Sequence, residues 1–214
     1  DGLMGLGYDS VSGISNATKT NANFIDSLNL PGESNVFGFY LSNSVDNTNG
    51  SISIGGIDKT KFTGPINYFP VIRKRVWEID ISKMTFNVGG FKGPMSIQST
   101  AIADSGTSNF LLEARVANSV NSAVGARLIP TQSMIYEIDC MALKTGVDVV
   151  LSMSGVDFVF PPASYIQEIQ LSNNQKACIT RFNAGASKIS IFGDAFNRAY
   201  YTIYDKANHR VGFA

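Results

Sequence analysis

The feature that most constrains how this chain can fold is the segment TAIADSGTS at residues 100–108. A short apolar run leads into a tight turn of small and hydroxyl-bearing residues, and this turn carries one aspartate, Asp104. Gly106 has no Cβ, so its backbone can approach the carboxylate closely, and nearby hydroxyl and N–H groups can hold that carboxylate by hydrogen bonds. Asp-Ser-Gly alone is common in surface turns. Here a second apolar stretch follows at residues 110–112, so the sequence predicts a packed site rather than a solvated loop.

Composition excludes several classes of function. The 214 residues include 17 Lys and Arg and 17 Asp and Glu, so the formal net charge of zero does not indicate a nucleic acid or an anionic membrane as partner. No apolar stretch reaches the roughly 18 residues of a membrane-spanning helix, so no membrane span is expected. With a single histidine, His209, and no cluster of His and Cys, neither a Ser-His triad nor a zinc site is expected. We therefore expect no metal and no cofactor.

Apolar and polar residues alternate in several segments bounded by Gly, Asn and Asp, and this pattern predicts a mainly β chain. The longest predicted helix has apolar residues at every fourth position and is followed by Gly125, which can end it. The single tryptophan, Trp77, is expected in the core. The predicted elements are strands at 51–54, 147–153 and 200–204, a hairpin turn at 205–208, and helices at 23–28 and 112–124.

A second informative segment, ISIFGDAFNRAYYTIYD, lies at residues 189–205. Together with the Asp104 turn it resembles the second lobe of the pepsin-like aspartic proteases. That lobe carries an apolar-apolar-Asp-Thr/Ser-Gly-Thr turn, an apolar-apolar-Gly-Asp segment packed beside it, an aromatic-rich stretch and a Val-Gly-Phe/Leu-Ala ending. Ser105 in place of threonine, with the general texture of the sequence, is most similar to the plasmepsin branch. The resemblance covers essentially the whole chain, through DGLMGLGY at 1–8, SISIGGID at 51–58, FTGP at 62–65, WEI at 77–79 and NHRVGFA at 208–214.

The resemblance implies an all-β, pepsin-like acid protease fold with a few short helices, of which this chain contains the C-terminal lobe. The family uses two aspartates, one from each lobe of a bilobal enzyme, whereas only one Asp-Ser/Thr-Gly occurs here. Residues 1–8 resemble the apolar-apolar-Gly segment of the first lobe, the counterpart of residues 191–193. We therefore assign residues 1–8 to the end of the N-terminal lobe's active-site loop and residues 9–214 to the interlobe region and the C-terminal lobe. The chain is then the heavy chain of a cleaved enzyme, or a fragment.

The resemblance also implies a paired-carboxylate mechanism in which Asp104 supplies one carboxylate. Two carboxylates held close together cannot both ionise cheaply, so one keeps a proton while the other acts as a base on a water molecule between them, as is established for aspartic proteases. The partner aspartate is expected from an N-terminal lobe or light chain. Ser105, Gly106 and Thr107 are expected to support the site. Thr107 resembles the threonine whose hydroxyl helps to lock the active-site loops of the two lobes together.

Substrate-binding residues are implied in the same way. Gly106 and Ser108 resemble the positions that line the cleft and hydrogen-bond the substrate backbone. Ile102 and Ile191 fit the apolar walls of the pocket, with plain core packing as the open alternative for both. Asp194 matches a family position for which a structural hydrogen-bonding role, rather than catalysis, is expected.

The two cysteines are Cys140 and Cys178. Their spacing leaves buried free thiols and a disulfide equally open. The resemblance implies that they form the disulfide that closes a loop of the second lobe. A disulfide indicates an oxidising compartment, so we expect the secretory pathway, with a secreted, lysosomal or vacuolar destination. Asn16 and Asn49 begin glycosylation acceptor patterns that are consistent with this route.

The function implied is that of a zymogen-derived aspartic endopeptidase, which acts on peptide or protein substrates and binds pepstatin-type inhibitors. Two alternatives stay open. A catalytically inactive pepsin-like binding protein is possible because the first aspartate lies outside this chain. A homodimeric protease of the retroviral type needs only one aspartate per chain, although the subunits of that class are much shorter.

Overall fold

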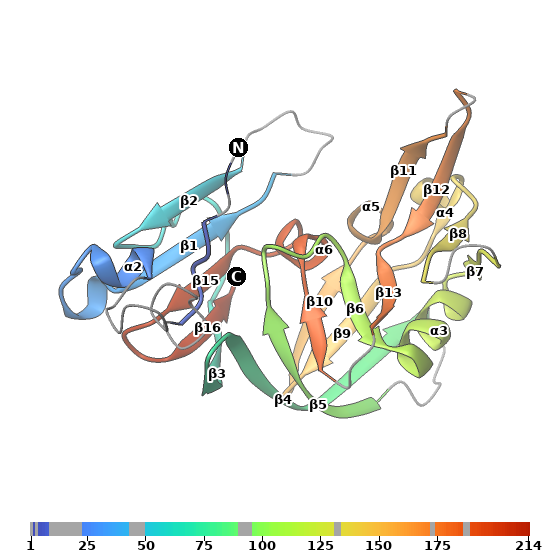
Figure 1. Ribbon diagram of the computed structural model, residues 1–214. Helices are drawn as coiled ribbons and strands as arrows, with labels where there is room; N and C mark the ends of the chain where they lie inside the picture. The colour runs from blue at the N-terminus through green and yellow to red at the C-terminus, as the bar shows by residue number, and fades with distance from the viewer. Residues whose placement is uncertain are drawn as a thin grey trace. The chain divides into compact units, whose positions relative to one another are not determined.

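The strands and short helices of the chain fall into two compact units (Figure 1). The computed structural model describes residues 2, 4–8, 23–42, 50–89, 96–130, 134–171, 174–185 and 189–214. Unit 1 comprises residues 1–80 and 200–214, and unit 2 comprises residues 81–199. Strands predominate over helices in the described ranges, which confirms the expectation of a mainly β chain with a few short helices.

Unit 1 is built on an antiparallel sheet with the strand order β4–β3–β16–β15–β1–β2. Aromatic rings fill its core: the ring centroid of Trp77 lies 4.8 Å from that of Tyr8 and 5.1 Å from that of Tyr204, and Phe37 stacks on Tyr204 at 4.6 Å. Trp77 is buried as expected, and its Nε1 donates a hydrogen bond to the Leu6 carbonyl over 2.9 Å. The elements of unit 1 are α2 (Phe24–Ser27), a 3-10 turn η2 (Gly32–Ser34), β1 (Val36–Tyr40), β2 (Ser51–Ile54), β3 (Asn67–Lys74), the start of β4 (Trp77–Val88), β15 (Thr202–Asp205) and β16 (Arg210–Phe213).

Unit 2 contains two sheets. The larger has the order β13–β6–β14–β5–β4, with β9 paired to β4 and β10 to β9. The smaller is antiparallel, in the order β11–β12–β8–β7. The elements are the rest of β4, β5 (Ser96–Ala103), β6 (Phe110–Glu113), α3 (Ala114–Ala123), β7 (Arg127–Leu128), β8 (Tyr136–Ile138), α4 (Ala142–Thr145), β9 (Val149–Met153), β10 (Val156–Phe160), α5 (Pro162–Tyr165), β11 (Ile166–Gln170), β12 (Lys176–Thr180), β13 (Phe182–Gly185), β14 (Ser190–Phe192) and α6 (Asp194–Asn197).

A cluster of phenylalanines forms the core of unit 2 next to the Asp104 turn. The ring centroid of Phe110 lies 5.1 Å from that of Phe182, 5.3 Å from that of Phe160 and 5.8 Å from that of Phe192, and all four side chains are fully buried. Helix α3 packs against β6 and β13 (Figure 1), and it buries Val116, Ala117 and Val120. Burial of so much apolar area is the dominant favourable contribution to folding, and here it makes a rigid base for the turn.

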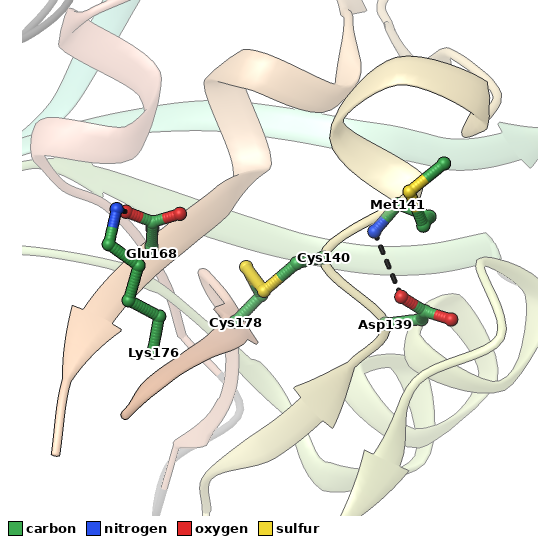
Figure 2. Close-up of a disulfide and its surroundings, with 6 residues drawn as sticks. All are labelled: Asp139, Cys140, Met141, Glu168, Lys176 and Cys178. Carbon is green, nitrogen blue, oxygen red and sulfur yellow. Dashed lines mark hydrogen bonds and ion pairs between the residues drawn. A yellow bond between two sulfur atoms is a disulfide. The ribbon is translucent and has the colours of Figure 1, made fainter. Parts of the chain in front are cut away.

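The predicted disulfide is confirmed. Cys140, which follows β8, is bonded to Cys178 on β12, 38 residues further along the chain (Figure 2). On the neighbouring strand β11, Glu168 forms an ion pair of 2.7 Å with Lys176. The disulfide therefore links the segment after β8 to the centre of the smaller sheet.

The predicted strands are present, but two of them begin later than expected. Residues 51–54 form β2 as predicted. Strand β9 begins at Val149 rather than at 147, because the Val147 carbonyl accepts a hydrogen bond from the Tyr165 hydroxyl over 2.8 Å instead of pairing in the sheet. Strand β15 begins at Thr202 rather than at 200 and includes Asp205, which pairs with Arg210 on β16. The hairpin turn consequently occupies residues 206–209 rather than 205–208.

The prediction for the longer helix was wrong about the residue at which it begins. Leu112 belongs to β6, where it pairs in parallel with Ala184 of β13, so α3 begins only at Ala114. Its end agrees with the prediction, because Gly125 follows it with a φ of +84°, in the left-handed region that favours glycine. The shorter helix, α2, lies within the predicted range, and the Asn23 side chain caps it by accepting from the backbone N–H of residue 25.

Two sequence-based expectations concern segments that the structure does not describe. The acceptor asparagines Asn16 and Asn49 both lie outside the described residues, as do residues 1 and 3 of the segment 1–8. Among the helices that are described, none combines the length and the apolar composition needed to cross a bilayer.

Candidate active site

Two parallel strands of unit 2 end side by side at the Asp104 turn. Strand β14 pairs with β5 so that Ile191 lies beside Ile102, and Phe192 lies beside Ala103. One residue beyond that pair, the Asp104 backbone N–H donates to the Phe192 carbonyl over 3.0 Å. The aspartate is therefore held by the last hydrogen bond of a strand pair whose far side is the buried phenylalanine core.

Both oxygens of the half-buried Asp104 carboxylate accept hydrogen bonds from its own turn. The Gly106 N–H donates to Oδ1 over 2.9 Å, and the Thr107 hydroxyl donates to Oδ2 over 2.7 Å. A Cβ at position 106 would lie 3.1 Å from Oδ1, closer than most Cβ contacts, which explains why a glycine suits this position. A carboxylate held through both oxygens keeps a fixed orientation, which is what acid–base chemistry requires.

A second segment fixes the main chain of the turn from the other side. The Asp194 N–H donates to the Thr107 carbonyl over 2.7 Å, and the Ala195 N–H donates to the Ser108 carbonyl over 3.2 Å. A Cβ at Gly193 would lie 2.1 Å from the Thr107 carbonyl oxygen and 2.6 Å from that of Asn109. Only glycine allows the two backbones to come this close, which explains the glycine before Asp194 in the second sequence segment.

The structure brings together the other predicted residues of the turn. The Ser105 and Ser108 side chains are exposed. The Thr107 hydroxyl, expected to lock two loops together, is observed on the Asp104 carboxylate. Among the described residues, the Thr107 hydroxyl therefore bonds to the carboxylate of the aspartate three positions before it.

Apolar side chains form a row beside the turn. Ile102, Ile191 and Leu111 occupy matching positions on β5, β14 and β6, and all three are half-buried, whereas Ala103 and Phe192 on the opposite face are buried. This row is accessible enough to contact a ligand. Sequence reasoning identified the two isoleucines but missed Leu111, whose place depends on a strand register that no local pattern encodes.

Charged groups gather next to the turn. Burial raises the pKa of Asp194 above its usual value and the nearby Asp104 charge adds to this, while the Arg198 and Arg181 guanidiniums act in the opposite direction. Burial lowers the pKa of Arg181, as does the charge of Arg198, and Asp194 partly compensates. The pKa of Asp194 therefore reflects burial, which raises it, against the charges of the two arginines, which lower it.

Elsewhere in the described chain, the indications of a functional site are weaker than at the Asp104 turn. A pocket of about 330 Å³ beside β7 and β8 is lined by Gly125, Arg127, Glu137, Ile138 and Asp139, none of which belongs to the turn. In the described ranges, no group of three or more His, Cys, Asp and Glu side chains is arranged to hold a metal ion.

Comparisons with known proteins bear on the whole chain. A family model described as "Eukaryotic aspartyl protease" matches residues 1–214. The chain is 33% identical over 214 residues to embryonic pepsinogen of Gallus gallus, covering 100% of this chain and 52% of that protein. It is 33% identical over 220 residues to gastricsin of Homo sapiens, covering 100% and 54% respectively. It is 31% identical over 216 residues to vacuolar protease A of Aspergillus fumigatus, covering 100% and 52%. The chain thus spans about half the length of the curated relatives that it matches.

Proposed function

Because this chain belongs to the eukaryotic aspartyl protease family, we propose that it supplies one half of an aspartic endopeptidase, with Asp104 as one of two catalytic carboxylates. The observation that carries the proposal is the double anchoring of Asp104, whose two oxygens accept hydrogen bonds from Gly106 and Thr107 at the end of a buried strand pair. Such anchoring is typical of a group that must keep its orientation while it exchanges a proton.

The second carboxylate belongs to an N-terminal lobe or light chain. When the two carboxylates face each other, one retains a proton and the other is a base, because two negative charges at short range repel each other. The base takes a proton from a water molecule placed between them, and the resulting hydroxide attacks the carbonyl carbon of the scissile peptide bond. The acid protonates the carbonyl oxygen, which gives a neutral tetrahedral intermediate. The carboxyl group that took the water proton then passes it to the amide nitrogen, and the other carboxylate takes a proton back from one hydroxyl of the intermediate. The C–N bond breaks, and a carboxylic acid and an amine leave a site with one protonated and one ionised carboxyl group. In this proposal residues 1–8 form the end of the active-site loop of the N-terminal lobe, and residues 9–214 form the rest of the interlobe region and the C-terminal lobe.

Substrate contacts follow from the surfaces next to Asp104. Gly106 and Ser108 are exposed residues that can hydrogen-bond an extended peptide, and the half-buried Ile102 and Ile191 provide an apolar wall. Leu111 extends that wall by one strand. The site is therefore suited to peptides with apolar side chains near the scissile bond, and to pepstatin-type inhibitors, which are peptide-like and apolar.

The secretory pathway is the location that we propose. The Cys140–Cys178 bond requires an oxidising compartment. One relative is called a vacuolar protease and another a pepsinogen, which supports a vacuolar or secreted enzyme made as a zymogen. Assignment to the plasmepsin branch stays a prediction, since it rests on Ser105 and sequence texture.

The test uses the complete protein, with this chain joined to its N-terminal half. We expect the complete protein to hydrolyse peptides at acid pH, and pepstatin to inhibit this hydrolysis. Residues 1–214 alone should show no hydrolysis. Addition of an N-terminal lobe in trans should restore it. Binding of pepstatin without turnover would instead identify an inactive binding protein. Full activity of the isolated chain would identify a homodimer of the retroviral type.

A further inference from the structure

Residues 4–8 of unit 1 and residues 192–196 of unit 2 share a sequence pattern, MGLGY and FGDAF. An apolar residue and a glycine come first in both segments, and an aromatic ring comes last. Leu6 therefore corresponds to Asp194, whose backbone N–H binds the Thr107 carbonyl of the Asp104 turn. Under the proposed function, residues 4–8 belong to the active-site loop of the N-terminal lobe, and Leu6 has the equivalent place there.

The main chain of a short helix holds the Asp194 carbonyl. This carbonyl accepts a hydrogen bond of 2.9 Å from the backbone N–H of Arg198, the residue that follows α6. Asp194 is thus bound through its N–H to the turn and through its carbonyl to the end of the helix. A residue that is bound at both main-chain groups has little freedom to rotate, so the anchor of the turn stays in place.

A side chain from another strand holds the Leu6 carbonyl. The indole Nε1 of Trp77, the first residue of β4, donates to this carbonyl over 2.9 Å. The Trp77 ring is buried, and its centroid lies 4.8 Å from that of Tyr8, 5.1 Å from that of Tyr204 and 5.7 Å from that of Phe37. An indole N–H can only donate, and the rings packed around it fix the direction in which it points.

The two residues after Leu6 are bound to unit 1 through other groups. The Asn23 side-chain amide donates to the Gly7 carbonyl, and the Tyr8 N–H donates to the Arg75 carbonyl over 3.2 Å. Asn23 also caps α2, so replacing it would disturb that helix as well. The bond from Trp77 is therefore the one that can be removed with the least other change.

We propose that Trp77 is a positioning residue of the complete active site, whose indole N–H fixes Leu6 and thereby the active-site loop of the N-terminal lobe. Trp77 does for that loop what the backbone N–H of Arg198 does for the segment that anchors the Asp104 turn. The inference rests on the proposed function, in which residues 1–8 form the end of that loop.

The test replaces Trp77 in the complete protein in two ways. Benzothienylalanine, incorporated at position 77, keeps the shape of the indole but has sulfur in place of the N–H, whereas Trp77→Phe removes the N–H together with part of the ring. Tyr165→Phe is the matched control. It removes another buried side-chain donor, since the Tyr165 hydroxyl donates to the Val147 carbonyl over 2.8 Å in unit 2.

Both replacements of Trp77 should lower kcat by about 10-fold, because a small misplacement of a catalytic group slows the chemical step. KM should change less than about twofold, since Trp77 does not contact the substrate in this account. Amide hydrogen exchange of residues 4–8 should become at least about fivefold faster. Tyr165→Phe should lower Tm to a similar extent but leave kcat and the exchange of residues 4–8 unchanged.

Activity that is lost in Trp77→Phe but retained with benzothienylalanine would overturn the inference, because packing of the ring would then be sufficient. Unchanged exchange of residues 4–8, or a kcat no lower than that of Tyr165→Phe, would also overturn it. If the unchanged complete protein shows no turnover, the proposed function fails. Hydrogen exchange then still decides whether the indole N–H holds residues 4–8, so the two failures are distinguishable.

Discussion

Replacement of Gly193 by alanine tests how closely the Asp104 turn is held. The new Cβ would lie 2.1 Å from the Thr107 carbonyl oxygen, whereas close carbon–oxygen contacts are about 3.3 Å. The carbonyl would therefore move by roughly 1 Å, and the 2.7 Å hydrogen bond from the Asp194 N–H would be lost. Overpacking costs about 1–3 kcal/mol and the lost bond about 1 kcal/mol. We expect the free energy of unfolding to fall by roughly 2–4 kcal/mol.

The same displacement should affect catalysis, because Thr107 holds Asp104 Oδ2. A misplacement of about 1 Å can lower a rate about 100-fold. Chemical denaturation and peptide hydrolysis by the complete protein measure the two effects. Gly56→Ala is the matched control, since a Cβ at this position would have no atom within 4 Å and its φ is not positive. Unfolding of the Gly193→Ala protein within about 0.5 kcal/mol of the unchanged protein, together with undiminished hydrolysis, would refute the close approach.

Three further substitutions test the Asp104 turn, the disulfide and the buried Ser190 hydroxyl. Thr107→Val should lower kcat/KM by about 10–100-fold, because a hydrogen bond to the Asp104 carboxylate contributes about 1.5–3 kcal/mol, and Thr107→Ser should retain activity. Cys140→Ala/Cys178→Ala should lower the free energy of unfolding by about 3–4 kcal/mol, and reduction of the unchanged protein should give the same loss. Ser190→Ala should raise the free energy of unfolding by about 1 kcal/mol in denaturant titrations, because the Ser190 hydroxyl is fully buried with no hydrogen-bond partner among the described residues.

Local sequence predicted the parts of the site that local chemistry determines. The turn at residues 104–107 was identified because an aspartate followed by small and hydroxyl residues can bond to its own turn, and the structure has those bonds. The same is true of the α3 terminus, where Gly125 takes a positive φ.

Features that depend on distant pairing could not be predicted. Leu112 fits a helical pattern, yet it forms a strand because β13, far along the chain, pairs with it. Leu111 reaches the apolar row through the same strand, which β14 pairs on its other side. Arg181 approaches the turn only after β12 and β13 have folded back, so no motif points to it. Hydrophobic periodicity reports which face is buried, but not which strand will lie beside it.

The catalytic role of Asp104 is tested by Asp104→Asn in the complete protein, with the exposed Asp148→Asn as control. Asparagine keeps the shape of the side chain but cannot exchange the proton. We predict that peptide hydrolysis falls at least about 1,000-fold while Tm stays close to that of the unchanged protein, and that Asp148→Asn leaves hydrolysis intact. Substantial turnover by a folded Asp104→Asn protein would contradict the assignment of Asp104 as one of the two catalytic carboxylates.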